Sequence, residues 1–412
     1  MTSSSGTPFR RVILAAVMLG ATACAPANRT ADGVIALRGA TIHPAPNSPP
    51  IPQGVVLIRD GKIEAVGSAA SIEVPEGAAE LDLTGQYLVA GYWNSHVHFA
   101  GERWAGADSA QAARLNAAVR EMLTRWGVTS AFDTGSDLAG TLALRQRIDS
   151  GDVDGPRIFT TGDIIFPSGA PMGRFRVTSP GEAGAAADSL LARNADGIKV
   201  YAQAWWDPAL VLSPEVLARV VAAAHQRNLP VFAHPSNRVG LHNAVAAGVD
   251  VLTHTTPQIG PWSDSLIASM RAADMALIPT LALWRFELEK ESVPAAEIAE
   301  FQGRGVAQLR AWFAAGGTVL FGTDVGYMTD FSTVEELEQM AAAGMSFHDI
   351  LASMTTVPAA WNGLEASSGR IAAGFDADLV VLGSDPTRDI TALADVRYTF
   401  RGGRPIYSAA EQ

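Results

Sequence analysis

The stretch Pro-Val-Phe-Ala-His-Pro-Ser-Asn-Arg-Val-Gly-Leu-His-Asn-Ala-Val-Ala-Ala-Gly-Val-Asp-Val-Leu-Thr-His, residues 230–254, contains two short apolar runs that each end in a histidine, His234 and His254. Runs of this kind recur along the middle of the chain and alternate with longer stretches of helical apolar spacing. This alternation predicts parallel strands joined by crossover helices.

Working outward from these two runs, we count eight candidate strands between about Leu88 and Gly363. They begin near Leu88, Val128, Arg157, Gly197, Pro230, Val251, Met275 and Thr318. Intervening helices are expected at Pro214–Gln226 and Ala295–Ala315, among others. Eight units over this length predict a (β/α)8 TIM barrel at residues 88–363. An open doubly wound sheet is the competing architecture, because a strand count does not show closure.

Both ends of the chain are β-rich. Short apolar runs separated by Gly and Pro occur at Val34–Leu37, Val55–Ile58, Lys62–Val66, Asp378–Leu382, Val396–Arg401 and Pro405–Tyr407. Asp60-Gly61 is typical of a tight turn between two strands.

The N-terminus has the pattern of an export signal. Arg10 and Arg11 precede an apolar stretch, residues 12–23, that is too short to span a bilayer. Residues 1–23 are therefore predicted to be a signal peptide and residues 24–32 a tether. Cys24, the single cysteine, resembles the lipidated residue of a bacterial lipoprotein, and plain cleavage after Ala23 is the alternative. We expect a periplasmic protein or one held at the bacterial cell envelope only through Cys24.

The overall charge limits the partners. The 412 residues carry a formal net charge of -12, with no basic run after the first dozen positions, which argues against nucleic acid as a ligand. A small-molecule substrate is expected, and a homo-oligomer is left open.

Six polar residues mark a candidate metal site. His96 and His98 are spaced i, i+2, so a strand would aim both imidazoles the same way. The other four end further predicted strands: Lys199, His234, His254 and Asp324. Any one could be a buried histidine bonded to a carbonyl, a snorkelling lysine or a helix cap. Because the C-terminal ends of barrel strands converge on one face, all six are expected in one pocket.

At these residues the chain resembles the amidohydrolase superfamily. Leu-Asp-Leu-Thr-Gly-Gln-Tyr-Leu-Val-Ala-Gly, residues 81–91, is similar to that family's approach to the barrel. Ile-Ala-Ala-Gly-Phe-Asp-Ala-Asp-Leu-Val-Val, residues 371–381, is similar to its return from the barrel. The resemblance implies a small β-sandwich built from residues 33–87 and 364–412. Ala90 and Asn94 stand where the family usually has proline and aspartate.

The resemblance also implies a binuclear centre. It assigns His96, His98 and Asp324 to one divalent ion and His234 and His254 to the other, with Lys199 bridging both as an N6-carboxylated lysine. Zinc is the expected metal, with manganese and iron as alternatives. A bridging hydroxide would attack the substrate, and Asp324 would carry its proton to the leaving nitrogen.

The resemblance is greatest to the branch containing prolidase-like dipeptidases and imidazolonepropionase-related proteins. It implies a peptidase or amidase that hydrolyses a dipeptide or an N-acyl amino acid. Hydrolysis of a cyclic amide or lactone at the same centre is one alternative. A non-catalytic binding scaffold at the cell envelope is the alternative of another class.

Residues for substrate contact are expected in the loops after the strands. Tyr201, two residues after Lys199, is a candidate donor to the oxyanion. Arg174, Arg176 and Arg285 are candidate clamps for a substrate carboxylate. Loop aromatics are candidates for binding or simply for packing between loops: Trp104, Phe166, Trp205, Trp206, Trp284, Phe286 and Tyr327.

Overall fold

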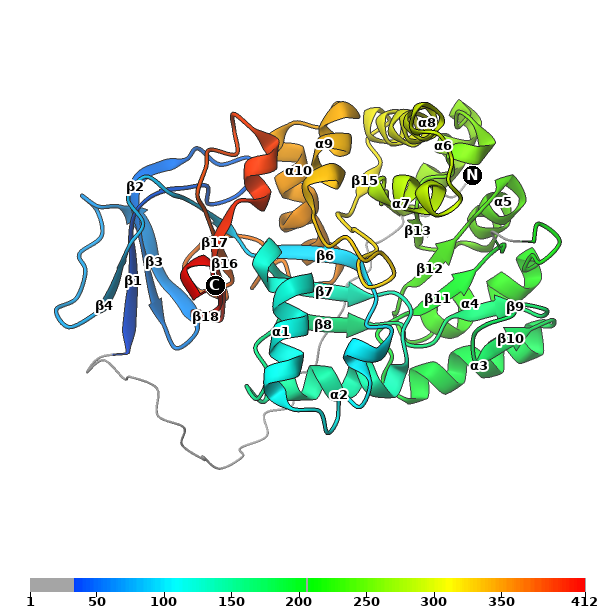
Figure 1. Ribbon diagram of the computed structural model, residues 1–412, viewed down its shortest axis with the longest axis horizontal. Coiled ribbons are helices and arrows are strands. Elements are labelled where there is room, and N and C mark those ends of the chain that lie inside the picture. The colour runs from blue at the N-terminus through cyan, green and yellow to red at the C-terminus, as the bar shows by residue number, and fades with distance from the viewer. Residues whose placement is uncertain (1–32, 205–206, 412) are drawn as a thin grey trace, which may run out of the picture.

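The computed structural model describes residues 33–204 and 207–411. Figure 1 shows strands from both chain ends side by side at one end of the molecule, with the helix-rich middle of the chain at the other. The predicted signal peptide, the tether with Cys24, and the loop residues Trp205 and Trp206 lie outside the described residues. Within the described residues, no helix combines the length and apolarity needed to cross a membrane.

The two chain ends form one eight-stranded sheet. Its hydrogen-bonding order is β18-β17-β16-β5-β1-β2-β3, and β4 pairs in parallel with β1. These strands are β1 (Val34–Ile42), β2 (Ile51–Arg59), β3 (Lys62–Ser68), β4 (Ala79–Asp82), β5 (Tyr87–Ala90), β16 (Leu379–Leu382), β17 (Val396–Arg401) and β18 (Arg404–Ser408). Asp60 and Gly61, both at positive φ, make the predicted tight turn between β2 and β3. The sandwich form of this region stays a prediction.

The middle of the chain supplies the barrel strands and the helices around them. The strands are β6 (Tyr92–Val97), β7 (Val128–Asp133), β8 (Arg157–Thr160), β11 (Ile198–Tyr201), β12 (Val231–His234), β13 (Val251–Thr253), β14 (Ala276–Ile278) and β15 (Thr318–Val319). The helices are α1 (Ala112–Met122), α2 (Leu138–Asp149), α3 (Pro180–Ala192), α4 (Pro214–His225), α5 (Arg238–Ala247), α6 (Asp264–Ala272), α7 (Ala282–Lys290), α8 (Ala295–Ala314), α9 (Val334–Ala342), α10 (Phe347–Met354) and α11 (Thr356–Trp361). Two further short strands, β9 (Ile165–Pro167) and β10 (Phe175–Val177), extend the sheet beside β11.

Backbone hydrogen bonds close the eight strands into a ring. Parallel pairing runs from β6 through β8 and from β11 through β15. Asp196 N donates to Thr160 O at 2.7 Å and joins the two groups. His98 N donates to Val325 O at 2.8 Å, which connects the chain after β15 back to β6. An open sheet has no such last-to-first connection, so the chain forms the predicted (β/α)8 barrel.

The strand predicted from about Leu88 is two strands. Leu88 pairs with Val381 of β16 in the terminal sheet, whereas the barrel begins at Tyr92. The domain boundary predicted between residues 87 and 88 therefore falls inside β5. The chain passes between the sheets at Gly91, where a Cβ would lie only 2.2 Å from Oγ1 of Thr129.

Local sequence signals fix the helix ends. Ser213 accepts a hydrogen bond from Val216 N, and Pro214 occupies the first helical position of α4. The helix predicted at Pro214–Gln226 therefore begins at the expected residue, and it ends one residue earlier than predicted, at His225. The helix predicted at Ala295–Ala315 is α8, which ends at Ala314. Helices with such caps pack apolar faces on the barrel and leave the C-terminal strand ends to the loops.

Candidate metal centre and active site

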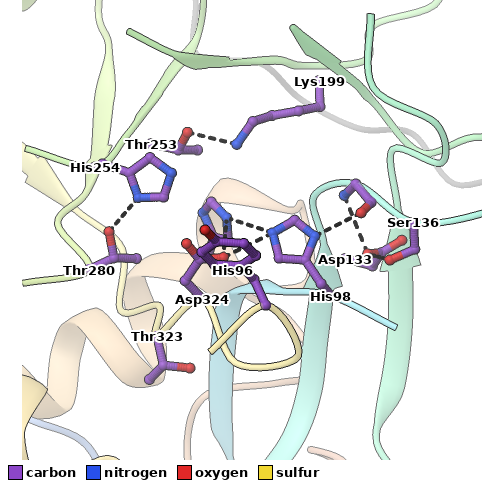
Figure 2. A network of polar contacts seen from close by, with 12 residues as sticks. His96, His98, Asp133, Ser136, Lys199, Thr253, His254, Thr280, Thr323 and Asp324 are labelled. Carbon is purple, nitrogen blue, oxygen red and sulfur yellow. Dashed lines mark hydrogen bonds and ion pairs between the residues drawn. The ribbon is translucent and has the colours of Figure 1, made fainter. Parts of the chain in front are cut away.

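The six residues expected to meet at the strand ends line one cavity. They are His96, His98, Lys199, His234, His254 and Asp324, and the cavity has a volume of about 380 Å³. All six are buried. Figure 2 shows five of them, His96, His98, Lys199, His254 and Asp324, grouped around a common centre. The structure thus brings together residues that are up to 228 positions apart, from His96 to Asp324.

His96, His98 and Asp324 form one side of the centre. The Nε2 atoms of the two histidines lie 3.3 Å apart. Oδ1 of Asp324 is 3.3 Å from Nε2 of His96 and 2.9 Å from Nε2 of His98. Both histidines belong to or directly follow β6, and Asp324 is anchored beside them because its N–H donates to His96 O at 2.9 Å.

The loop after β7 orients His98. Its Nδ1 donates to Gly135 O at 2.8 Å, which leaves Nε2 facing the cavity. Asp133 holds this loop by accepting hydrogen bonds at 2.6 Å from Ser136 Oγ and from Thr160 Oγ1. Asp133 is a positioning residue missed by the sequence analysis. Its location at the C-terminal end of a barrel strand is the signal that would have found it.

His234, His254 and Lys199 form the other side. The two imidazole rings lie 4.6 Å apart between centroids. His254 Nδ1 is 2.6 Å from Oγ1 of Thr280, so its Nε2 is turned toward the cavity. Lys199 Nζ donates at 2.7 Å to Oγ1 of Thr253, whose own hydroxyl donates to a backbone carbonyl.

Burial controls the protonation of these groups. It lowers the pKa of His96 to about 3 and the pKa values of His234 and His254 well below the ordinary value, so these imidazoles are neutral. Burial also lowers the pKa of Lys199 to about 7. Burial would raise the pKa of Asp324, but the neighbouring His96 and His98 hold it well below its usual range.

The donor set suits a divalent cation. Among the described residues, His96, His254 and Asp324 offer ligand atoms that all lie within 4.8 Å of one another. His98 Nε2 and Asp324 Oδ1 lie 2.9 Å apart; burial would lower the pKa of His98, but Asp324 raises it, so this position between the two atoms favours a positive charge, either a proton or a metal cation. Neutral imidazoles and an ionised carboxylate are common ligands of zinc and of related first-row metals.

Two of the six residues have a backbone conformation that is rare for residues other than glycine. His254 has φ 75° and Asp324 has φ 62°. Strained residues of this kind persist where the surrounding structure fixes them and concentrate at functional sites. This feature is independent support for the same site.

Outside the six candidate ligands, the cavity wall combines aromatic and apolar side chains with one acidic residue, Glu287. Tyr201, Trp284 and Tyr327, all expected near the substrate, line it together with Phe166. Tyr201 stacks on His234 with a ring separation of 4.1 Å and an interplanar angle of 9°. Trp104 and Phe286 are not among the lining residues.

The three arginines expected to clamp a carboxylate do not reach the cavity. Arg174 and Arg176 are exposed. Arg285 is occupied by ion pairs with Glu289 at 2.9 Å and Glu335 at 2.7 Å. The prediction of these residues as a carboxylate clamp is therefore not supported by their positions.

Glu287 was missed by the sequence analysis and does line the cavity. It lies three residues after Trp284 and four after Leu283 on α7. Because residues at these spacings share one helix face, this pattern is the signal that would have found it.

A closed parallel barrel with histidines, a lysine and an aspartate buried at the C-terminal strand ends defines a barrel enzyme with a candidate metal centre. The sequence profile of the amidohydrolase family matches residues 87–406, and the chain belongs to this family. It is an enzyme that hydrolyses carbon–nitrogen bonds.

Three known proteins illustrate the similarity. The sequence is 24% identical over 407 residues to the ochratoxinase of Aspergillus niger, covering 86% of this chain and 83% of that one. A protein of Bifidobacterium longum assigned provisionally as a prolidase is 28% identical, with a TM-score of 0.78 over 91% of this chain and 95% of that one. Phenylurea hydrolase B is 24% identical, with a TM-score of 0.75 over 92% and 97% of the two chains, and shares the fold.

Proposed function

We propose that this protein hydrolyses an amide-type bond of a small, largely apolar substrate at a centre that binds two divalent metal ions. The observation that carries the proposal is the convergence of four buried imidazoles, Lys199 and Asp324 on one cavity at the C-terminal end of the barrel. Aromatic walls around the cavity support an apolar substrate.

In this proposal, His96, His98 and Asp324 would hold one ion, and His234 and His254 would hold the other. Lys199 would supply a further anionic ligand, because its neutral amine can add CO2 and release a proton to become a carbamate. Its low pKa favours this reaction, because about half of the amine is unprotonated at pH 7. When bound, two divalent cations supply a water of lowered pKa and polarise the scissile carbonyl.

Two residues of the chain carry the proton and charge movements. Asp324 accepts the proton of the attacking water and delivers it to the leaving nitrogen. Tyr201 donates its hydroxyl to the oxygen on which negative charge develops. Partial burial raises the pKa of Tyr201, which keeps that hydroxyl protonated.

The test combines metal analysis with substrate profiling. Purified protein, loaded with two equivalents of zinc, manganese or iron, is assayed on dipeptides, N-acyl amino acids and neutral arylamides. Hydantoins and lactones test the cyclic alternative. A protein that retains no paired metal and cleaves no member of the panel would fit a binding scaffold and refute the proposal.

A variant separates the carbamate bridge from general damage. Lys199→Ala is expected to lose paired metal occupancy and most activity. His225→Gln is the matched control, because His225 pairs with Asp250 at 3.0 Å and does not line the cavity. A Lys199→Ala protein that keeps both metals and its activity would rule out the bridge.

Export is part of the proposal. The N-terminal pattern supports a periplasmic or envelope-anchored enzyme, with Cys24 as the site of lipid attachment.

A further inference from the structure

The charge of the cavity wall limits what the enzyme binds. Outside the six proposed metal ligands, Glu287 is the single charged side chain that lines the cavity in the described part of the chain. Its carboxylate is largely shielded, since its side chain is 19% exposed. No arginine, and no lysine other than Lys199, lines the cavity among the described residues. A substrate carboxylate would therefore meet another carboxylate and no guanidinium clamp.

Apart from the metal ions proposed to lie among the six ligands, the positive charge nearest to Glu287 is a side chain outside the cavity. Lys290 Nζ contacts Glu287 at 2.9 Å and the Tyr327 hydroxyl at 3.2 Å, and it sits 4.0 Å from the ring centroid of Phe286. Lys290 is half exposed and does not line the cavity. Glu287 and the rings of Phe286 and Tyr327 hold the Lys290 ammonium in place. The ammonium therefore offsets part of the Glu287 charge from the solvent side.

The rim of the cavity is apolar. Met172 is 53% exposed and Tyr327 is 48% exposed, and these are two of the most exposed large hydrophobic side chains among the described residues. Both line the cavity. Apolar side chains left in water at the mouth of a pocket indicate a ligand that covers them.

We propose that the enzyme selects amides built on an aryl or alkyl frame that carry an amine or ammonium group directed at Glu287, and that it disfavours amides with a carboxylate near the scissile bond. Glu287 is the specificity-determining residue. This inference rests on the proposed hydrolysis and narrows its substrate class away from free dipeptides and N-acyl amino acids.

Matched substrates test the selectivity. The first series is N-benzoyl-phenylalanine, its carboxamide, and the analogue in which aminomethyl replaces the carboxylate. A second series places carboxylate, carboxamide or aminomethyl on the para position of the benzoyl ring of a benzanilide, so that the charge lies on the acyl side. In at least one series, kcat/KM of the wild-type holoenzyme should rise from carboxylate through carboxamide to aminomethyl, by about tenfold for the last step. A preference for the carboxylate, or no preference in either series, would overturn the inference.

A binding measurement gives the same information without turnover. Phenethylamine and 2-phenylethanol share the apolar frame and differ in the ammonium group, and calorimetry on the holoenzyme should give about tenfold tighter binding of the amine. Amine-selective binding without hydrolysis of any amide would refute the proposed function and support the selectivity. Hydrolysis of amides with equal binding of the amine and the alcohol would support the proposed function and refute the selectivity.

Variants assign the effect to one residue. Glu287→Gln should abolish the preference for the amine, and Lys290→Met should increase it severalfold because the acid loses its outer partner. Glu289→Gln is the matched control: Glu289 lies on the same helix, pairs with Arg285 and does not line the cavity. A Glu287→Gln enzyme that keeps the wild-type preference would overturn the assignment, and so would a Lys290→Met enzyme that loses it.

Discussion

Glu336 on α9 is a fully buried acid beside the helix that carries Glu287. One of its oxygens accepts a hydrogen bond from Ala282 N at 2.9 Å, where α7 begins, and the other has no partner among the described residues. Burial raises its pKa from the ordinary 4.5 to about 8. The folded protein therefore holds this proton over a pH range in which the unfolded chain has released it, and stability is lost as the pH rises from about 4.5 through about 8.

Replacing Glu336 by Gln should remove this pH-dependent loss. Gln keeps an acceptor for Ala282 N and carries no charge. At about 1.4 kcal/mol for each tenfold change in proton affinity, a pKa of about 8 in place of 4.5 costs the wild type about 5 kcal/mol at high pH. The free energy of unfolding of Glu336→Gln minus that of the wild type should thus grow between pH 5 and 8, by up to about 1.4 kcal/mol per pH unit in the middle of this range.

Urea unfolding followed by tryptophan fluorescence at four pH values, with the same saturating zinc, measures this difference. The pH dependence of metal binding is common to both proteins and cancels. Glu338→Gln, an exposed acid on the same helix, is the control and should give a flat difference. A flat difference for Glu336→Gln as well would show that Glu336 ionises at its ordinary pKa in the folded protein and refute the reasoning.

Three more predictions concern the centre and the N-terminus. Thr280→Val removes the partner of His254 Nδ1 and should weaken metal binding by about 10- to 100-fold in a chelator competition, and unchanged affinity would contradict the orienting role. Tyr201→Phe keeps the stacking on His234 but loses the hydroxyl, so kcat should fall by about 100-fold at unchanged metal content, whereas a loss of metal would indicate a structural role. Cys24→Ser should release the protein from the membrane fraction into the periplasm, and wild-type protein already found wholly soluble there would exclude the lipid anchor.

The candidate ligands could be named from the sequence because a barrel converts position along a strand into position in space. His234 ends β12, and His254 directly follows β13, so their place in the chain was enough to bring them together. The same logic would have added Asp133, the last residue of β7. Helix limits were also accessible, since Ser213 and Pro214 are local signals for a helix start.

Structural features that depend on contacts between residues distant in the sequence could not be predicted from the sequence. The chain from Tyr87 to Val97 is a nearly continuous extended segment, and its division between two sheets depends on pairing with β16, almost 300 residues later. The sequence predicted Arg285 as a clamp for a substrate carboxylate, but its guanidinium forms an ion pair with Glu335. This partner lies on a different helix, α9, so the ion pair could not be predicted from the residues around Arg285 on α7. The sequence lists charged residues without showing which are already neutralised.

The backbone geometry of the site also depends on contacts between residues that are distant in the sequence. Left-handed φ values at His254 and Asp324 each cost on the order of 1 kcal/mol and are not encoded by either residue type alone. Neighbouring strands hold them: His254 N donates to Ile278 O at 2.8 Å, and Asp324 N donates to His96 O at 2.9 Å. The second of these bonds also joins the last barrel segment to the first. Because this hydrogen bond orients the ligand and is also one of those that close the barrel, together with His98 N to Val325 O, the observed shape of the centre requires the closed barrel.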